Sequence, residues 1–145
     1  MATVNVYLNF NGNCEEAFNF YKSVFGGEFP YIGRFGEMPP SDNYTVPESD
    51  ANKIMHVSLP ISKETVLMGS DTGAEWTPGF TPGNNFSISI NADSKVEAEK
   101  LFNGLSNGGK VTMPLNKTFW SENFGMLTDK FGIAWMVSFD GNMQK

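Results

Sequence analysis

The sequence predicts an α+β fold in which two paired βαβββ units form a curved mixed sheet around a cavity. Two observations predict it. An alternating strand followed by an amphipathic helix occurs twice along the chain, and three strand candidates follow each helix. Each helix also ends at a glycine pair, and the pairs Gly26-Gly27 and Gly108-Gly109 lie 82 residues apart. Because one helix covers only one face of each unit, the second unit must close the other face, where we expect a ligand.

The first unit is expected to span residues 1–71 and to begin with a strand. Residues 3–10 alternate, and the apolar residues of one face are Val4, Val6, Leu8 and Phe10. Asn13 is the expected N-cap of the next helix, with Glu16 three residues later. The buried stripe of that helix is predicted to be Ala17, Phe18, Tyr21 and Phe25.

Three more strands complete the first unit, and two loops follow from composition. The strands are expected at residues 28–35, 53–61 and 64–71. Residues 36–50 are rich in proline and acid, so they are predicted to form a loop, and its length makes it a candidate lid. The glycine- and proline-rich residues 72–83 are predicted to be the loop that joins the two units.

The second unit is expected to span residues 84–141 and to repeat this order. Its first strand, residues 85–91, alternates Phe86, Ile88 and Ile90 with Ser87 and Ser89. Ser94 and Glu97 are spaced as a capping box. The helical stripe that follows consists of Ala98, Leu101, Phe102 and Leu105.

Three strands are expected after this helix, at residues 110–115, 124–128 and 133–139. Asp129 is an acidic residue in a very apolar stretch, which raises the question of a chemical role. It lies between the last two strands, however, where aspartate and glycine are typical turn formers. Residues 128–132 are therefore predicted to be a hairpin connection.

Composition narrows the functional classes. The 145 residues suit a single domain, residues 1–145, and the net charge of -6 disfavours partners such as nucleic acids and anionic membrane surfaces. No apolar run has the length of a transmembrane helix, and the first residues lack the pattern of a signal peptide, so we expect a cytoplasmic protein.

Cys14 is the only cysteine, which excludes an internal disulfide. Although it lies in the first turn of a helix, where a thiol pKa is lowered, a packed thiol is favoured over a catalytic one.

Three stretches carry a resemblance to a known family: NFNGNCEEAFNFYKSVFGGEF, IMHVSLPI with VLMGSD, and WSENFGMLTDKFGIAWMVSF. They resemble the PhnB-like branch of the vicinal oxygen chelate superfamily, which includes glyoxalase I, extradiol dioxygenases, and bleomycin and fosfomycin resistance proteins. The resemblance implies the glyoxalase/bleomycin resistance fold, a cavity lined by eight strands, and a homodimer. It also implies a divalent metal, which enzymes of the superfamily hold with histidines and glutamates on the first and fourth strands of each unit.

The residues at those positions do not fit a metal. The fourth-strand glutamates of the superfamily align with Met68 and Met136, and a thioether is a poor ligand for a hard divalent ion. The first strands offer Asn5, Tyr7, Asn9, Ser87 and Ser89, none of which is a histidine or a carboxylate. We therefore expect no metal site and no cofactor. A methyltransferase label often given to this branch is also disfavoured, because such enzymes need a nucleotide-like cofactor site on a doubly wound sheet.

The branch commonly reads D-P-F-G-H-x-W where this chain reads DKFGIAW. The proline of that motif is replaced by Lys130, and its histidine by Ile133. Any chemistry that relatives perform with that histidine is lost in this chain.

A set of neutral side chains forms the predicted ligand-binding surface. His56 is the only histidine and is expected on one strand face with Ile54 and Ser58. It either binds the ligand or is a sheet histidine satisfied by a neighbour. The other hydrogen-bonding groups on the same concave face either bind the ligand or only meet solvent. The methionines either line an apolar pocket or fill the ordinary core, and the tryptophan lines either the pocket or a dimer interface. The remaining predicted ligand-binding residues are Tyr7, Asn9, Ser87, Ser89, Met68, Met136 and Trp120.

The sequence thus favours a protein that binds a small organic molecule in a metal-free cavity, and it specifies no catalytic residue. The alternative is a metal-dependent lyase or dioxygenase in which His56 joins loop carboxylates such as Glu37, Glu64 or Asp71. A purely structural dimer is a third reading.

Overall fold

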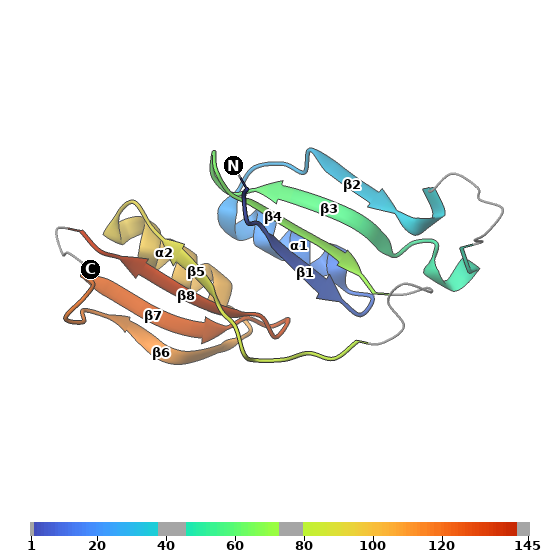
Figure 1. Ribbon diagram of the computed structural model, residues 1–145. Coiled ribbons are helices and arrows are strands. Elements are labelled where there is room, and N and C mark those ends of the chain that lie inside the picture. Colours follow the sequence, from blue (N-terminus) through green and yellow to red (C-terminus); the bar gives the residue numbers. More distant parts are fainter. Residues whose placement is uncertain (1, 38–45, 73–79, 142–145) are drawn as a thin grey trace. The chain divides into compact units, whose positions relative to one another are not determined.

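A computed structural model describes residues 2–37, 46–72 and 80–141 of the chain (Figure 1). It divides into two compact units, Met1–Thr81 and Pro82–Lys145, and the boundary lies within residues 72–83. Each unit has the order βαβββ, with a mixed four-stranded sheet and one long helix. The α+β class predicted from the repeat is therefore confirmed. Neither long helix of the described ranges has the length and apolarity needed to cross a membrane.

The first unit is built on the sheet order β1-β4-β3-β2. Strand β1 runs parallel to β4, and the other neighbours are antiparallel. Helix α1 packs on β3 and β4 and covers one face of the sheet (Figure 1). The elements are β1 (Val6–Phe10), α1 (Cys14–Phe25), β2 (Tyr31–Arg34), the short 3₁₀ turns η1 (Phe35–Glu37) and η2 (Glu48–Asp50), β3 (Ile54–Pro60) and β4 (Val66–Asp71).

The second unit repeats this arrangement with the order β5-β8-β7-β6, and again its first and last strands are parallel. Helix α2 packs on β6, β7 and β8. The Ser94 Oγ accepts the Glu97 N–H at 3.0 Å, as the capping box predicts, and the Glu97 carboxylate accepts the Asp93 N–H at 2.8 Å. The elements are β5 (Ile88–Asn91), α2 (Lys95–Ser106), β6 (Lys110–Asn116), β7 (Asn123–Thr128) and β8 (Ala134–Phe139).

Both predicted helical stripes are buried, with one exception. In α1 the buried set includes Ala17, Phe18 and Tyr21, whereas Phe25 at the end of the helix is only half-buried. In α2 all four predicted residues are buried. Each helix thus contributes one apolar side to the core of its own unit.

The cap of α1 is not the one the sequence predicted. Asn13 makes no side-chain capping bond. Instead the Asp71 Oδ1, from the end of β4, accepts the Gly12 and Cys14 N–H groups, both at 2.9 Å. A partner 57 residues away satisfies the orphan donors at this helix start, so a local capping rule could not find it.

The first strand of each unit starts later than predicted. Strand β1 begins at Val6, and the Val4 side chain is 98% exposed rather than part of the apolar face. Strand β5 begins at Ile88, so Ser87 and the exposed Phe86 precede it. Ile54 also departs from its predicted face. A register shift opposite β2 separates it from His56, and Ile54 is buried in the core.

Asp129 forms the predicted hairpin connection between β7 and β8. Its Oδ1 accepts the Phe131 and Ile133 N–H groups at 2.8 and 3.0 Å, and its Oδ2 accepts the indole N–H of buried Trp135 at 2.8 Å. Gly132 adopts a φ of 88°, which a residue with a side chain rarely adopts. The acid is a turn former tied to the core.

A glycine lets each helix approach its sheet, but the two units place it on different strands. Gly69 of β4 faces Phe18 and pairs with Val57 of β3. In the second unit the equivalent pair is reversed, because the glycine is Gly125 on β7 and its β8 partner is Val137. A Cβ at either glycine would lie 2.6 Å from the ring of the helix phenylalanine, Phe18 or Phe102.

Candidate functional site

The face of the first sheet that α1 does not cover carries the predicted site residues of the first unit. Side chains alternate along each strand, and Leu8, Val57 and Leu67 are buried on the helix side. On the opposite, open face a row runs across all four strands. In this row Tyr7 pairs with Met68, Met68 with Ser58, and Ser58 with Tyr31.

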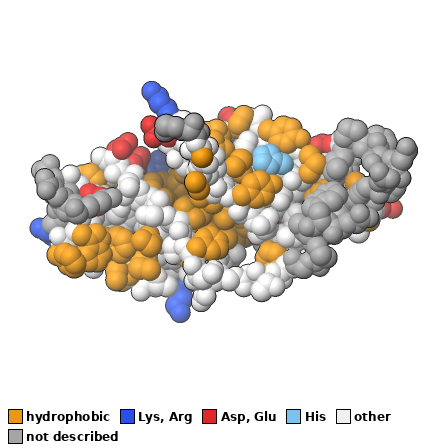
Figure 2. Space-filling model, in the orientation of Figure 1, with side chains coloured by type: hydrophobic (Ala, Val, Ile, Leu, Met, Phe, Trp, Pro, Cys, Tyr) orange, Lys and Arg blue, Asp and Glu red, His pale blue; other side chains and the backbone are white. Residues whose placement is uncertain are grey.

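His56 lies on this open face, between two tyrosines. Its Nδ1 is 3.1 Å from the Tyr7 hydroxyl, and the two rings are 5.5 Å apart. The Tyr31 ring lies 5.9 Å from the imidazole. The imidazole (pale blue) is visible at the surface in Figure 2. We call Tyr7, Tyr31 and His56 the His56 cluster.

The hydrogen bond defines what the imidazole can offer. When the Tyr7 hydroxyl donates to Nδ1, the proton of the neutral ring lies on Nε2. The ring then presents a donor away from Tyr7. Tyr7 and Tyr31 are about half exposed, so their rings also offer apolar surface.

Gly33 shapes this cluster. It is buried beside Tyr31 on β2 and pairs with His56. An added Cβ at Gly33 would collide with the Tyr31 hydroxyl and ring. The missing side chain therefore lets the Tyr31 ring lie over β2. Sequence reasoning missed both residues. The signal available was their position two residues apart in YIGR, which places them on one strand face.

The other predicted residues of the first unit lie near the cluster. Met68 is half-buried and adjoins Tyr7 across the β1–β4 ladder. Asn9 is exposed two residues farther along β1 and pairs with Ser70. Tyr7, His56 and Met68 thus share the open face with Asn9 at its edge.

Of the predicted residues of the second unit, Ser89 and Met136 lie on the sheet, whereas Trp120 and Ser87 lie outside its strands. Ser89 pairs with Met136, and Met136 continues through Met126 to Met113 as a row of three methionines across β8, β7 and β6. Trp120 lies in the loop before β7, where its ring contacts Phe119 and Phe124 at 4.6 and 5.4 Å between centroids. The row is an apolar, polarizable surface, whereas exposed Ser87 precedes the strand.

Of the carboxylates considered for a rearranged metal site, two already accept backbone hydrogen bonds and the third is exposed in a turn. Asp71 accepts a third N–H, from Ile54, at 2.8 Å. Glu37 accepts the Arg34 N–H at 2.9 Å, and Glu64 is exposed in the β3–β4 turn. Within residues 2–37, 46–72 and 80–141, no group of three or more His, Cys, Asp or Glu side chains is arranged to hold a metal ion. Residues 38–45 of the candidate lid and 73–79 of the joining loop lie outside the described ranges.

Cys14 is a packed thiol, as predicted, but its electrostatics differ from the expectation. The side chain is fully buried. Burial raises the pKa of the Cys14 thiol, and the negative charges of Asp71 and Glu15 raise it further. These effects outweigh the effect of the helix terminus, which was expected to lower the thiol pKa. Cys14 is therefore not an activated nucleophile.

Comparison with known proteins gives a consistent picture over nearly the whole chain. Residues 2–138 match the family described as 3-demethylubiquinone-9 3-methyltransferase. The chain is 30% identical to Protein YjdN of Escherichia coli strain K12, over 91% of each chain. It is 43% identical to the protein PA1353 of Pseudomonas aeruginosa, with a TM-score of 0.81 over 97% of this chain and 98% of that one.

Two further solved structures extend the comparison. The PhnB protein of Bacillus cereus is 27% identical, with a TM-score of 0.71, over 95% of this chain and 99% of that one. A glyoxylase/bleomycin resistance protein/dioxygenase domain from Frankia shares the fold, with 17% identity and a TM-score of 0.60, over 97% of this chain and 98% of that one.

Proposed function

Because the chain belongs to the family described as 3-demethylubiquinone-9 3-methyltransferase, the PhnB-like branch of the glyoxalase/bleomycin resistance/dioxygenase superfamily, we propose that it binds a small organic molecule at the His56 cluster. The observation that carries this proposal is the imidazole held by the Tyr7 hydroxyl on an uncovered sheet face. Met68 and Asn9 extend the proposed surface along β4 and β1.

The chemistry of the cluster favours a partly apolar ligand with a hydrogen-bond acceptor. When the Tyr7 hydroxyl donates to Nδ1, the imidazole Nε2–H supplies one directed donor, and the tyrosine rings supply flat apolar surface. Few convergent polar groups among aromatic side chains are typical of small-molecule sites. An aromatic or heteroaromatic carbonyl compound combines both features.

The side chains at the positions where the superfamily holds its metal support ligand binding without a metal. Thioethers replace carboxylates at Met68 and Met136, and Asp71 is engaged with three backbone N–H groups. A methyltransferase role receives no support from the architecture, because each unit is a mixed βαβββ sheet rather than a doubly wound parallel one.

The first prediction concerns ligand binding. A screen of small heteroaromatic carboxamides, followed by NMR of the His56 and Tyr7 ring signals, should find compounds that shift these signals saturably. Tyr7→Phe keeps the ring but loses the hydroxyl that orients the imidazole, so binding should weaken about tenfold. His56→Ala should weaken it further.

The control for this prediction is Phe119→Ala, which removes a largely exposed ring of the second unit and should leave the affinity unchanged. Equal binding by wild type and His56→Ala would contradict the proposal. Metal analysis of protein purified without chelators tests the alternative. A stoichiometric Mn, Ni, Zn or Fe ion that protects the protein from unfolding would favour the lyase or dioxygenase reading.

A further inference from the structure

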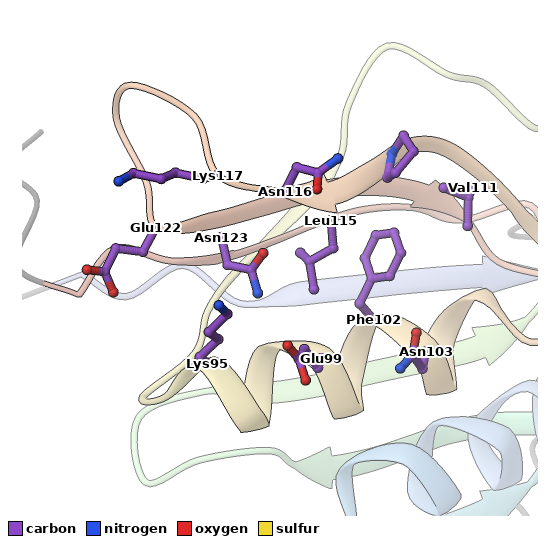
Figure 3. Close-up of a pocket in the computed structure, with 11 residues that line it drawn as sticks. Lys95, Glu99, Phe102, Asn103, Val111, Leu115, Asn116, Lys117, Glu122 and Asn123 are labelled. Carbon is purple, nitrogen blue, oxygen red and sulfur yellow. The ribbon is translucent and has the colours of Figure 1, made fainter.

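A cavity of about 730 Å³ lies within the second unit, between α2 and the strands β6 and β7 (Figure 3). This volume is in the range of small-molecule sites. Lys95 and Phe102 line it from the helix, and Leu115 and Asn123 from the strands. None of these residues belongs to the His56 cluster.

The Asn123 carboxamide is the unusual group in this cavity. Asn123 is only 4% exposed. Its N–H donates to the Ser121 Oγ at 3.3 Å, and its carbonyl accepts the Ser121 hydroxyl at 2.8 Å. Among the residues that the structure describes, its side-chain amide has no hydrogen-bond partner. Figure 3 shows this amide pointing from β7 into the cavity.

A buried amide without a partner costs stability, so its presence calls for a partner from outside the chain. The backbone at this position is already satisfied by Ser121 and by the ladder to Phe139. An apolar side chain would therefore fold as well. The cavity in front of the amide is the place where a ligand could supply the missing hydrogen bond.

Lys95 adds a positive charge beside the amide. It is the first residue of α2, and Figure 3 shows its side chain rising from the helix toward Asn123. Within the described ranges Lys95 forms no ion pair. The positive end of the α2 dipole and the ammonium both favour a negative group here. Glu99 and Glu122 also line the cavity, and their charges disfavour a ligand with several negative charges.

Phe102 and Leu115 form an apolar part of the wall, next to the polar Asn103, Asn116 and Lys117. Phe102 is 6% exposed, and its ring packs against Gly125 of β7. Leu115 projects from β6 toward the helix beside it (Figure 3). A hydrocarbon chain along these side chains would leave water, which is the main source of affinity for such a ligand.

We propose that the second unit binds a small monocarboxylate with an apolar chain in this cavity. One carboxylate oxygen accepts a hydrogen bond from the Asn123 Nδ2, the Lys95 ammonium compensates the charge, and the chain lies along Phe102 and Leu115. The site is independent of the His56 cluster, so His56→Ala should retain it.

Hexanoate is the probe for this site. Titration into the ¹⁵N-labelled full-length protein should shift the Asn123 side-chain amide signals saturably. Hexanamide should bind about tenfold more weakly because it lacks the charge, and hexylamine should not bind. Lys95→Gln should weaken hexanoate about tenfold. Lys100→Gln, on the same helix but outside the cavity lining, is the matched control and should change nothing.

Asn123→Leu gives a second readout. It removes the unpaired amide, so it should raise the midpoint of thermal unfolding while abolishing hexanoate binding. A lower midpoint in Asn123→Leu would mean that the amide serves the fold, and it would overturn the proposal. The proposal also fails if hexanoate gives no saturable shift at millimolar concentration, or if Lys95→Gln and Lys100→Gln bind it equally.

Discussion

Two aspartates of the described chain look like candidate acids and serve the fold instead. Asp71 ends β4, and Asp129 directly follows β7. Both are almost fully buried, and each accepts at least two backbone N–H groups. A buried carboxylate is stable only when hydrogen bonds replace its hydration, and here the backbone supplies them. The two proposed sites depend instead on His56, in the first unit, and on the Asn123 amide with Lys95, in the second.

Asp71→Ala should lower the free energy of unfolding by at least about 3 kcal/mol, because it leaves the N–H groups of Gly12, Cys14 and Ile54 without a partner. Urea denaturation followed by circular dichroism measures the change. Glu64→Ala removes an exposed carboxylate and should stay within about 0.5 kcal/mol of wild type. A small effect of Asp71→Ala would show that water replaces the carboxylate.

The kind of information that places a residue decides which candidate site residues could be predicted from the sequence. His56 was predicted on an open strand face because its neighbours in the strand alternate, and a period of two fixes the face. Tyr31 was missed because its place depends on the absent side chain of Gly33. Asn123 was missed for a different reason. Its lack of a partner is a property of tertiary packing, and no local pattern encodes it.

At the scale of elements, one aromatic ring of each helix packs directly over one glycine of its sheet. The contact between Phe18 and Gly69 in the first unit has its counterpart between Phe102 and Gly125 in the second. Close packing of this kind tolerates neither an added methyl group nor a void. The glycine lies on the last strand in one unit and on the third strand in the other, so each helix is matched to its own sheet.

Gly69→Ala should destabilise the protein by about 1–3 kcal/mol, because the new methyl group meets the Phe18 ring and the Leu8 carbonyl. Chemical denaturation provides the measurement. The added change Phe18→Leu should recover part of the loss, since it withdraws the ring. Gly83→Ala is the matched control, because its Cβ would meet only the Asn85 side-chain oxygen, at an ordinary contact distance of 3.8 Å. Strictly additive losses in the double variant would contradict this account.

An ion pair joins α1 to β2 and gives the first unit a pH-dependent contact. Arg34 donates to both carboxylate oxygens of Glu15, at 3.0 and 2.7 Å, and to the Asn52 carbonyl. The hydrogen bond from Arg34 lowers the pKa of Glu15 below its usual value of 4.5; burial opposes this shift, and the positive charge of Arg34 adds to it. A lowered pKa in the folded state means that the pair stabilises the protein above that usual value.

This contribution should therefore be present at neutral pH and disappear as the pH falls below 4.5 and through the lowered pKa of Glu15. The pair is partly exposed, so the effect should stay below about 1 kcal/mol. Glu15→Gln should be less stable than wild type at pH 7, and the difference should close in acid. Its neighbour Glu16, for which no ion pair is found in the described ranges, provides the control Glu16→Gln.

At the scale of the whole molecule, the repeat could be predicted from the sequence. The periods of strands and helices, and the glycine pairs that end the helices, are local properties of the chain. They gave the order βαβββ twice, and the start of the second helix at Ser94 was also correct. The cap of the first helix was not, because Asp71 reaches it from the far end of the unit. The first strand of each unit was predicted to start too early, since alternation continues into residues such as the exposed Val4.

The position of Asp71 has a mechanical consequence for a chain made of two linked units. The segment leading to the second unit leaves from β4, which lies between β1 and β3 inside the sheet. Tension on that segment first meets the Thr72 N–H bonded to the Phe10 carbonyl, and then the three bonds of Asp71. A pull along β4 loads these bonds together with the parallel β1 ladder in shear rather than one by one. Asp71 thus ties the point where the chain leaves the first unit to the starts of both α1 and β3.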